Sequence, residues 1–189
     1  MLNELARSIR FDNASKGFDP LDGGVNRYIL LSISELCEAQ NEFRDGRGVS
    51  EIYYSDKVGL ATVHYAPHEK GEALPGANLK PEGVPVEIAD AIIRLLDIAG
   101  KFSHDLEAGQ AEAVDFENCT VDDWLLGVVN IISDMFNYDP EHIDFWFALR
   151  QALGTLFLFC ERHDIKIMDV VEEKLAYNRT RPPKHGRKF

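Results

Sequence analysis

The chain has 189 residues, which is long enough for one domain with a sizeable core, and its 45% hydrophobic and 28% charged residues exclude a disordered protein. Lys and Arg number 20 against 32 Asp and Glu, so the formal net charge is −12. This balance excludes a non-specific nucleic-acid binder, but it leaves room for a small polyanion that binds through metal ions.

The first half of the chain has mainly helical periodicity. Apolar residues recur at helical spacing over 1–16 and 25–44, with the turn-rich FDPLDGG between them. The run 49–85 differs, because it begins with β-branched and aromatic residues and contains four prolines. We therefore expect a long, partly extended loop there, with room for a hairpin.

The second half predicts four more helices and a polar linker at 108–120. The strongest helix covers about 86–103 and is apolar on most of its circumference, as a buried helix is. Its polar residues fall on one stripe, which consists of Glu87, Asp90, Arg94, Asp97 and Lys101. The other helices cover 121–137, 143–162 and 167–178, and a basic tail follows at 179–189. These elements predict one all-α domain over 1–189.

A faint internal repeat accompanies these helices. FSHDL at 102–106 recurs as ERHDI at 161–165, and RYILLSISELCEAQ at 27–40 is echoed by DWLLGVVNIISDMF at 123–136. The matches are short, and any two amphipathic helices align in part by chance. A true repeat and a chance match both stay open.

Two pairs of carboxylates are chemically informative. Glu35 and Glu38 lie in SELCEA, and Glu87 and Asp90 lie in VEIADA. Three-residue spacing places both members of a pair on one helix face. Two such faces that meet would supply four oxygen ligands of the kind that Mg²⁺ prefers. A single pair is common on a solvated face, but Asp90 sits between two alanines in a helix with little exposed surface. From the spacing alone, two interpretations stay open: the pairs share one metal site, or each pair lies on a separate solvated helix face.

The C-terminal segment KLAYNRTRPPKHGRK gathers basic residues in a strongly acidic protein. Composition alone favours a solvated tail. The functional alternative is that Lys174 and Arg181 contact the phosphates of a ligand while the Asn178 amide forms a hydrogen bond. Carboxylates for metal together with cations for phosphate would suit a nucleoside triphosphate.

The compartment follows from the cysteines and from the apolar runs. The three cysteines have no close spacing, which argues against a disulfide framework or a zinc site and favours a reducing compartment. The N-terminal residues lack a signal-peptide core, and no run of about 18 apolar residues predicts a membrane span. We expect a soluble, cytoplasmic protein without a membrane partner.

Three motifs occur in the order found in a known family. SELCEA, then KPEGVPVEIADAIIRLLD, then EKLAYNRTRPPKHG resemble the MazG-like family of all-α nucleoside triphosphate pyrophosphohydrolases. The resemblance covers about 1–48, 78–107 and 167–189. It implies a MazG-like helical bundle that converts an NTP or dNTP and water to the monophosphate and pyrophosphate, with Mg²⁺ or Mn²⁺ as cofactor.

The resemblance also implies roles for single residues. The implied metal ligands are Glu35, Glu38, Glu87 and Asp90. Of these, Glu38 or Glu35 would take the proton of the attacking water as the catalytic base. The implied nucleotide contacts are Lys174, Tyr177, Asn178 and Arg181. Asn13, Lys16 and Phe18, in NASKGF, match a recurrent N-terminal stretch of the family that could approach the base, although ordinary helix-end and core residues are the simpler interpretation.

The chain departs from the family pattern at three places. Many members carry a Glu directly before ExxE, where this chain has Ser34, which leaves the identity of the base open. The segment between the acidic helices is long, with its extra material at about 49–77. Residues 108–165 form an additional helix pair, which as a degenerate repeat would supply within one chain the helices that other members take from a second subunit. An exposed 121–162 without contact to the first helix pair would contradict that hypothesis.

Two other functions stay open at this stage. One is an all-α phosphohydrolase that acts on another phosphate compound. The other is a catalytically decayed protein that binds nucleotides or regulates a partner, although such a site should have lost at least one of its four acids. The resemblance implies a homodimer, unless the additional helix pair acts as an internal partner. The sequence does not reveal the preferred base or sugar.

Overall fold

The computed structural model describes residues 1–19, 24–58, 61–65, 79–109 and 111–183. The predicted all-α fold is confirmed. Within these residues the helices are α1 (Leu2–Ser15), α2 (Val25–Arg44), α3 (Val84–Lys101), α4 (Val121–Asp134), α5 (Ile143–Arg162) and α6 (Ile167–Thr180), with a short 3₁₀ helix, η1 (Met135–Asn137), after α4. Part of the predicted loop, 66–78, and the end of the predicted basic tail, 184–189, lie outside the described residues.

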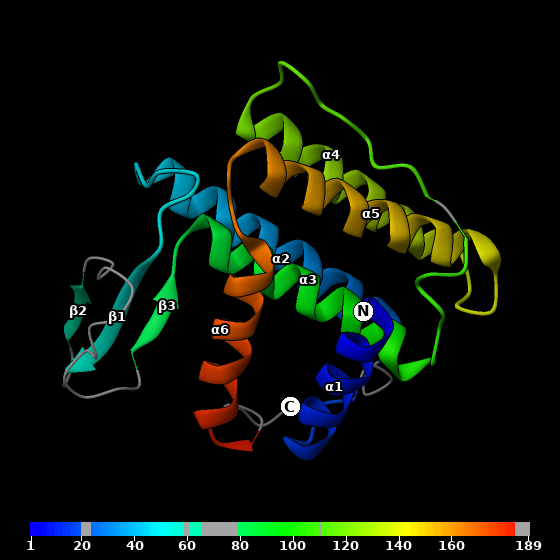
Figure 1. Cartoon of the computed structure of the whole chain (residues 1–189), viewed down its shortest axis with the longest axis horizontal. Coiled ribbons are helices and arrows are strands. Elements are labelled where there is room, and N and C mark those ends of the chain that lie inside the picture. The colour runs from blue at the N-terminus through cyan, green and yellow to red at the C-terminus, as the bar shows by residue number, and fades with distance from the viewer. Residues whose placement is uncertain (20–23, 59–60, 66–78, 110, 184–189) are drawn as a thin grey trace.

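Helix α3 is the centre of the molecule. Fourteen of its 18 residues are buried, as its apolar circumference predicts. Helix α2 runs beside it, α4 and α5 cover one side of this pair, and α1 and α6 lie on the other side (Figure 1). One apolar core joins all six helices. The acidic helices are therefore neighbours in the middle of the fold.

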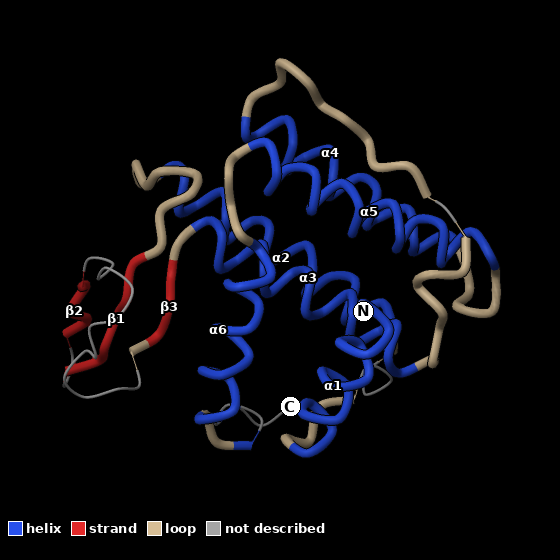
Figure 2. Tube along the Cα trace, in the orientation of Figure 1, coloured by secondary structure: helices blue, strands red, loops and turns tan. Residues whose placement is uncertain are grey.

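The excursion between α2 and α3 forms a small sheet at one end of the helices (Figure 2). Its strands are β1 (Tyr53–Val58), β2 (Ala61–Tyr65) and β3 (Lys80–Glu82), in the antiparallel order β2-β1-β3. The hydroxyl of Tyr54 donates to Glu173 on α6 at 2.6 Å, which ties β1 to the helices. Gly83 then joins β3 directly to α3 at φ +114°, with the carbonyl of Glu51 where a Cβ would lie, so only glycine fits. This junction sets β3 beside the acidic helices.

The two helices of the faint repeat, α3 and α5, have similar C-terminal ends, but these ends do not coincide with the alignment of the two sequences. Helices α3 and α5 each end at a residue with left-handed backbone, Ser103 at φ 51° and Asp164 at φ 54°. These residues are 61 positions apart, whereas FSHDL and ERHDI align at a separation of 59. The sequence match therefore does not follow the geometry of the helix ends.

The additional helix pair packs on the first one. Helix α4 lies against α2, and α5 lies against α3, so the contact that the internal-partner hypothesis requires is present. Helix α5 is the one described helix long and apolar enough to cross a membrane, and 56% of its apolar window is buried inside the protein. The core helix of a soluble protein has the same properties.

Gly100 is where α1 crosses α3, and it supports a first prediction. A Cβ at this position would lie 2.4 Å from the carbonyl oxygen of Ala6, a backbone atom that moves only with the whole of α1. We expect Gly100→Ala to lower the free energy of unfolding by about 2 kcal/mol, despite the better helix propensity of alanine. Urea denaturation measures this. Gly154→Ala is the matched control, because the nearest atom to its Cβ would be at 3.5 Å. Equal stability of the two variants would contradict the prediction.

Candidate active site

The polar stripe of α3 faces other segments of the chain and is almost fully paired. Glu87 and Asp97 are buried, and Asp90, Arg94 and Lys101 are half-buried. Four of its five residues contact an opposite charge on another segment: Asp90 with Lys174 (2.8 Å), Arg94 with Glu35 (2.5 Å), Asp97 with Arg10 (2.9 Å) and Lys101 with Asp19 (2.8 Å). Such pairing is what buried charges require.

Glu87 is the exception on this stripe. It is 3% exposed, and no residue in the described part of the chain forms a hydrogen bond or ion pair with its carboxylate. Burial raises the pKa of Glu87 to about 8, although the positive charges of Lys174 and Lys80 act in the opposite direction. Ionising Glu87 near neutral pH is therefore costly, and a bound cation would remove that cost.

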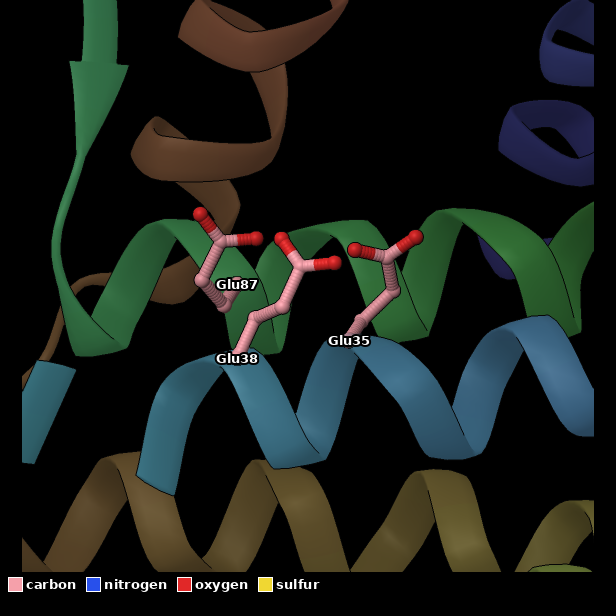
Figure 3. A group of neighbouring side chains, drawn as sticks. All are labelled: Glu35, Glu38 and Glu87. Atoms are coloured by element: carbon pink, nitrogen blue, oxygen red, sulfur yellow. The ribbon is translucent and has the colours of Figure 1, made fainter. Parts of the chain in front are cut away.

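Glu87 points toward two carboxylates of α2. Glu35, Glu38 and Glu87 each offer one oxygen within 4.8 Å of the others, and their side chains point to the same side of α2 and α3 (Figure 3). We call these three residues the acid cluster. Glu35 is buried, which raises the pKa of its carboxyl while Arg94 lowers it, and Glu38 is exposed. Oxygens on one octahedral Mg²⁺ lie about 3 Å apart when adjacent and about 4.2 Å apart when opposite, so the three side chains must draw closer by up to about 2 Å to hold such an ion. The residues fit a hard divalent cation.

Asp90, the fourth predicted ligand, is not part of the acid cluster. Its Oδ2 accepts a hydrogen bond from Nζ of Lys174, whose side chain is 3% exposed and needs a counter-charge. Asp90 nevertheless lines the same cleft as the cluster, and its negative charge raises the pKa of both Glu35 and Glu87. Three acids therefore lie together, and the fourth is held by lysine.

A cleft of about 380 Å³ opens over the acid cluster. It combines anionic and cationic walls. Its basic residues are Arg27, Lys80, Arg94, Lys174 and Arg181. Asn178 also lines it, and its Oδ1 is buried without a hydrogen-bond partner among the described residues. A cleft that holds carboxylates, cations and an unused amide acceptor can accommodate an anionic ligand together with metal.

The far end of this cleft is built around Asp97. Its two oxygens accept hydrogen bonds from Arg10 at 2.9 Å and from Asn13 at 2.8 Å, both on α1. Burial raises the pKa of Asp97 to about 6, against the effects of Arg10 and Asn13. Arg10 also donates to the carbonyl of Phe18, which fixes the segment after α1. These hydrogen bonds hold α1, which forms one wall of the cleft, against α3.

The predicted nucleotide contacts divide into two groups. Lys174, Asn178 and Arg181 line the cleft, whereas Lys16 and Tyr177 are not among its lining residues. Nζ of Lys16 donates to the carbonyl of Arg179 at 2.8 Å and to that of Arg181, which ties the end of α6 to α1. Tyr177 is half-buried, with the Arg181 guanidinium 5.9 Å from its ring centroid. Lys16 and Tyr177 therefore contact Arg181, which lines the cleft, and do not line the cleft themselves.

Sequence reasoning missed three basic residues of the cleft, which are Arg94, Lys80 and Arg27. Arg94 belongs to the recognised polar stripe, so its position was a usable signal. Lys80 opens the motif KPEGVPVEIADAIIRLLD, but spacing did not place it at the cleft, because it reaches the acids through the pairing of β3 with β1. Arg27 carried no signal. Ser34 lines the cleft, but its hydroxyl donates to the carbonyl of Leu31 at 2.9 Å within its own helix. It does not replace a glutamate as a base.

Comparison of the chain with protein-family models, curated proteins and solved structures finds no match. The family suggested by the three motifs therefore stays a prediction. The functional argument rests on the cleft.

Proposed function

We propose that the protein is a metal-dependent nucleoside triphosphate pyrophosphohydrolase of the cytoplasm, which converts an NTP or dNTP and water to the monophosphate and pyrophosphate. One observation carries the proposal: Glu87 is buried without a partner in the described part of the chain and lies beside two further carboxylates in a cleft lined by cations. The resemblance of the three motifs to the MazG-like family supports the same function.

The metal would be Mg²⁺ or Mn²⁺, because the offered ligands are carboxylate oxygens. The acid cluster would hold it, and Asp90 would join once its contact with Lys174 is released. The bound cation supplies charge neutralisation for the phosphates and lowers the pKa of water.

The chain's own residues perform the remaining steps. Lys174 and Arg181 bind phosphate oxygens and stabilise their charge as the water oxygen bonds to the α-phosphorus and the bond to the β,γ-pyrophosphate breaks. Glu38 takes the proton of the water. It suits this role better than Glu35, because Glu38 is exposed and has no hydrogen-bond or ion-pair partner among the described residues, whereas Glu35 is buried. Asn178 Oδ1 accepts a hydrogen bond from the nucleotide.

The test is pyrophosphate release from the eight common NTPs and dNTPs, with Mg²⁺ and with Mn²⁺. We expect release from at least one of them and a fall of at least about a hundredfold in Glu38→Gln, because this exposed side chain can change without harm to the fold. Asp90→Asn, with the same assay, tests the fourth acid. An active Asp90→Asn enzyme would remove Asp90 from the site, and silence of the wild type across the panel would contradict the proposed reaction.

A further inference from the structure

Arg94 contacts one carboxylate of the proposed metal site. Its Nε donates to Oε1 of Glu35 at 2.5 Å, and its Nη2 contacts the same oxygen. Glu35 belongs to the acid cluster. A positive side chain therefore holds one of the three carboxylates that would bind the cation.

Arg94 is free to leave this position. Its side chain is 33% exposed and lines the cleft, and Glu35 is its one hydrogen-bond and ion-pair partner in the described chain. Two other cations nearby, Arg10 and Lys174, are held more firmly. Arg10 contacts both Asp97 and the carbonyl of Phe18, and the Lys174 side chain is 3% exposed. Arg94 is thus the cluster's exchangeable counter-charge.

A divalent cation would change the balance of charge around Arg94. It would neutralise Glu35 in place of the guanidinium and repel the guanidinium at the same time. The released group stays within the cleft, where its planar fork matches two oxygens of one phosphate. The Arg94 side chain can therefore pair first with Glu35 and afterwards with the phosphate oxygens of a polyphosphate.

We propose that Arg94 exchanges partners, pairing with Glu35 in the metal-free protein and with the phosphate chain of the substrate once a divalent cation is bound. This rests on the proposed function and deepens it, because it names the ligand as a metal-complexed polyphosphate. The exchange makes the binding of metal and of polyphosphate mutually favourable, and this coupling is reciprocal by thermodynamic linkage.

The test measures the two ligands separately on the full chain. Mn²⁺ binding alone is followed by electron paramagnetic resonance, and inorganic tripolyphosphate binding is followed by calorimetry at saturating Mn²⁺. In Arg94→Met we expect Mn²⁺ alone to bind about tenfold more tightly, because its competitor is gone, and tripolyphosphate to bind at least about tenfold more weakly. Opposite signs for the two ligands are the signature, since a purely structural role would weaken both.

Arg27→Met is the matched control, because Arg27 lines the same cleft and, among the described residues, none of the three acids of the cluster forms a hydrogen bond or ion pair with it. It should change Mn²⁺ affinity by no more than about twofold. Arg94→Lys is the second variant should the methionine variant not fold: it should leave Mn²⁺ affinity near the wild-type value and still weaken tripolyphosphate. Two outcomes overturn the exchange: Mn²⁺ binding that is weaker or unchanged in Arg94→Met, or tripolyphosphate binding that is unchanged in either Arg94 variant. If the wild type binds Mn²⁺ and hydrolyses a nucleotide, these outcomes leave the proposed function standing. A wild type that binds no Mn²⁺ overturns both the exchange and the proposed function.

Discussion

Glu87→Gln is expected to stabilise the metal-free protein at pH 8 and to abolish its metal-dependent activity. The folded protein holds the pKa of Glu87 at about 8, against an ordinary value of 4.5. Between these two values the folded state binds more protons than the unfolded state, so stability falls as pH rises through this window and levels off above about pH 8. Glutamine has nearly the same shape and no charge to bury. The gain should be about 2–4 kcal/mol at pH 8 and close to zero at pH 4.5 and below.

Urea denaturation in a chelator at several pH values measures this gain, and pyrophosphate release at saturating metal measures the loss. Turnover should fall by at least about a hundredfold, because glutamine removes a charged ligand. Glu38→Gln is the matched control for stability: Glu38 is exposed, so its variant should gain far less stability at pH 8 than Glu87→Gln. A Glu87→Gln protein that is less stable than wild type at pH 8 would show that a partner, rather than an absent cation, satisfies the carboxylate.

The sequence predicted the helices because their signals are local. The circumference of α3 is apolar except for one stripe, and that pattern by itself places the helix at the centre of the core. The i,i+3 spacing of Glu35 and Glu38 likewise puts both carboxylates on one face of α2. These features need no knowledge of the rest of the chain.

The pairing of the acids could not be predicted in the same way. Asp90 differs from Glu87 only because α6 brings Lys174 to it, and that lysine lies 84 positions later in the chain. Lys80 reaches the cleft through the register of β3 on β1. Spacing identifies which side chains share a face, whereas the packing of distant elements decides which of them a cation neutralises.

Lys174→Met is expected to cause the largest loss of stability of any single substitution in the cleft. The Lys174 side chain is 3% exposed and pairs with Asp90 at 2.8 Å. Burial disfavours its charge, but Asp90 and Glu87 outweigh that effect and raise the pKa of the lysine. Methionine fills similar volume but leaves Asp90 without its counter-charge, and the loss of one partner of a buried pair costs about 3–5 kcal/mol.

The comparison that isolates this pair is the double variant Lys174→Met with Asp90→Leu. Replacing both charges by apolar groups should recover most of the lost stability, because no carboxylate is then left without its counter-charge. Mn²⁺ should also raise the melting temperature of Lys174→Met more than that of the wild type, since Asp90 is then free to join the acid cluster as a ligand. Wild-type stability of Lys174→Met in a chelator would show that the ion pair contributes nothing to the fold. An equal response of both proteins to Mn²⁺ would show that Asp90 does not become a ligand when its lysine is removed.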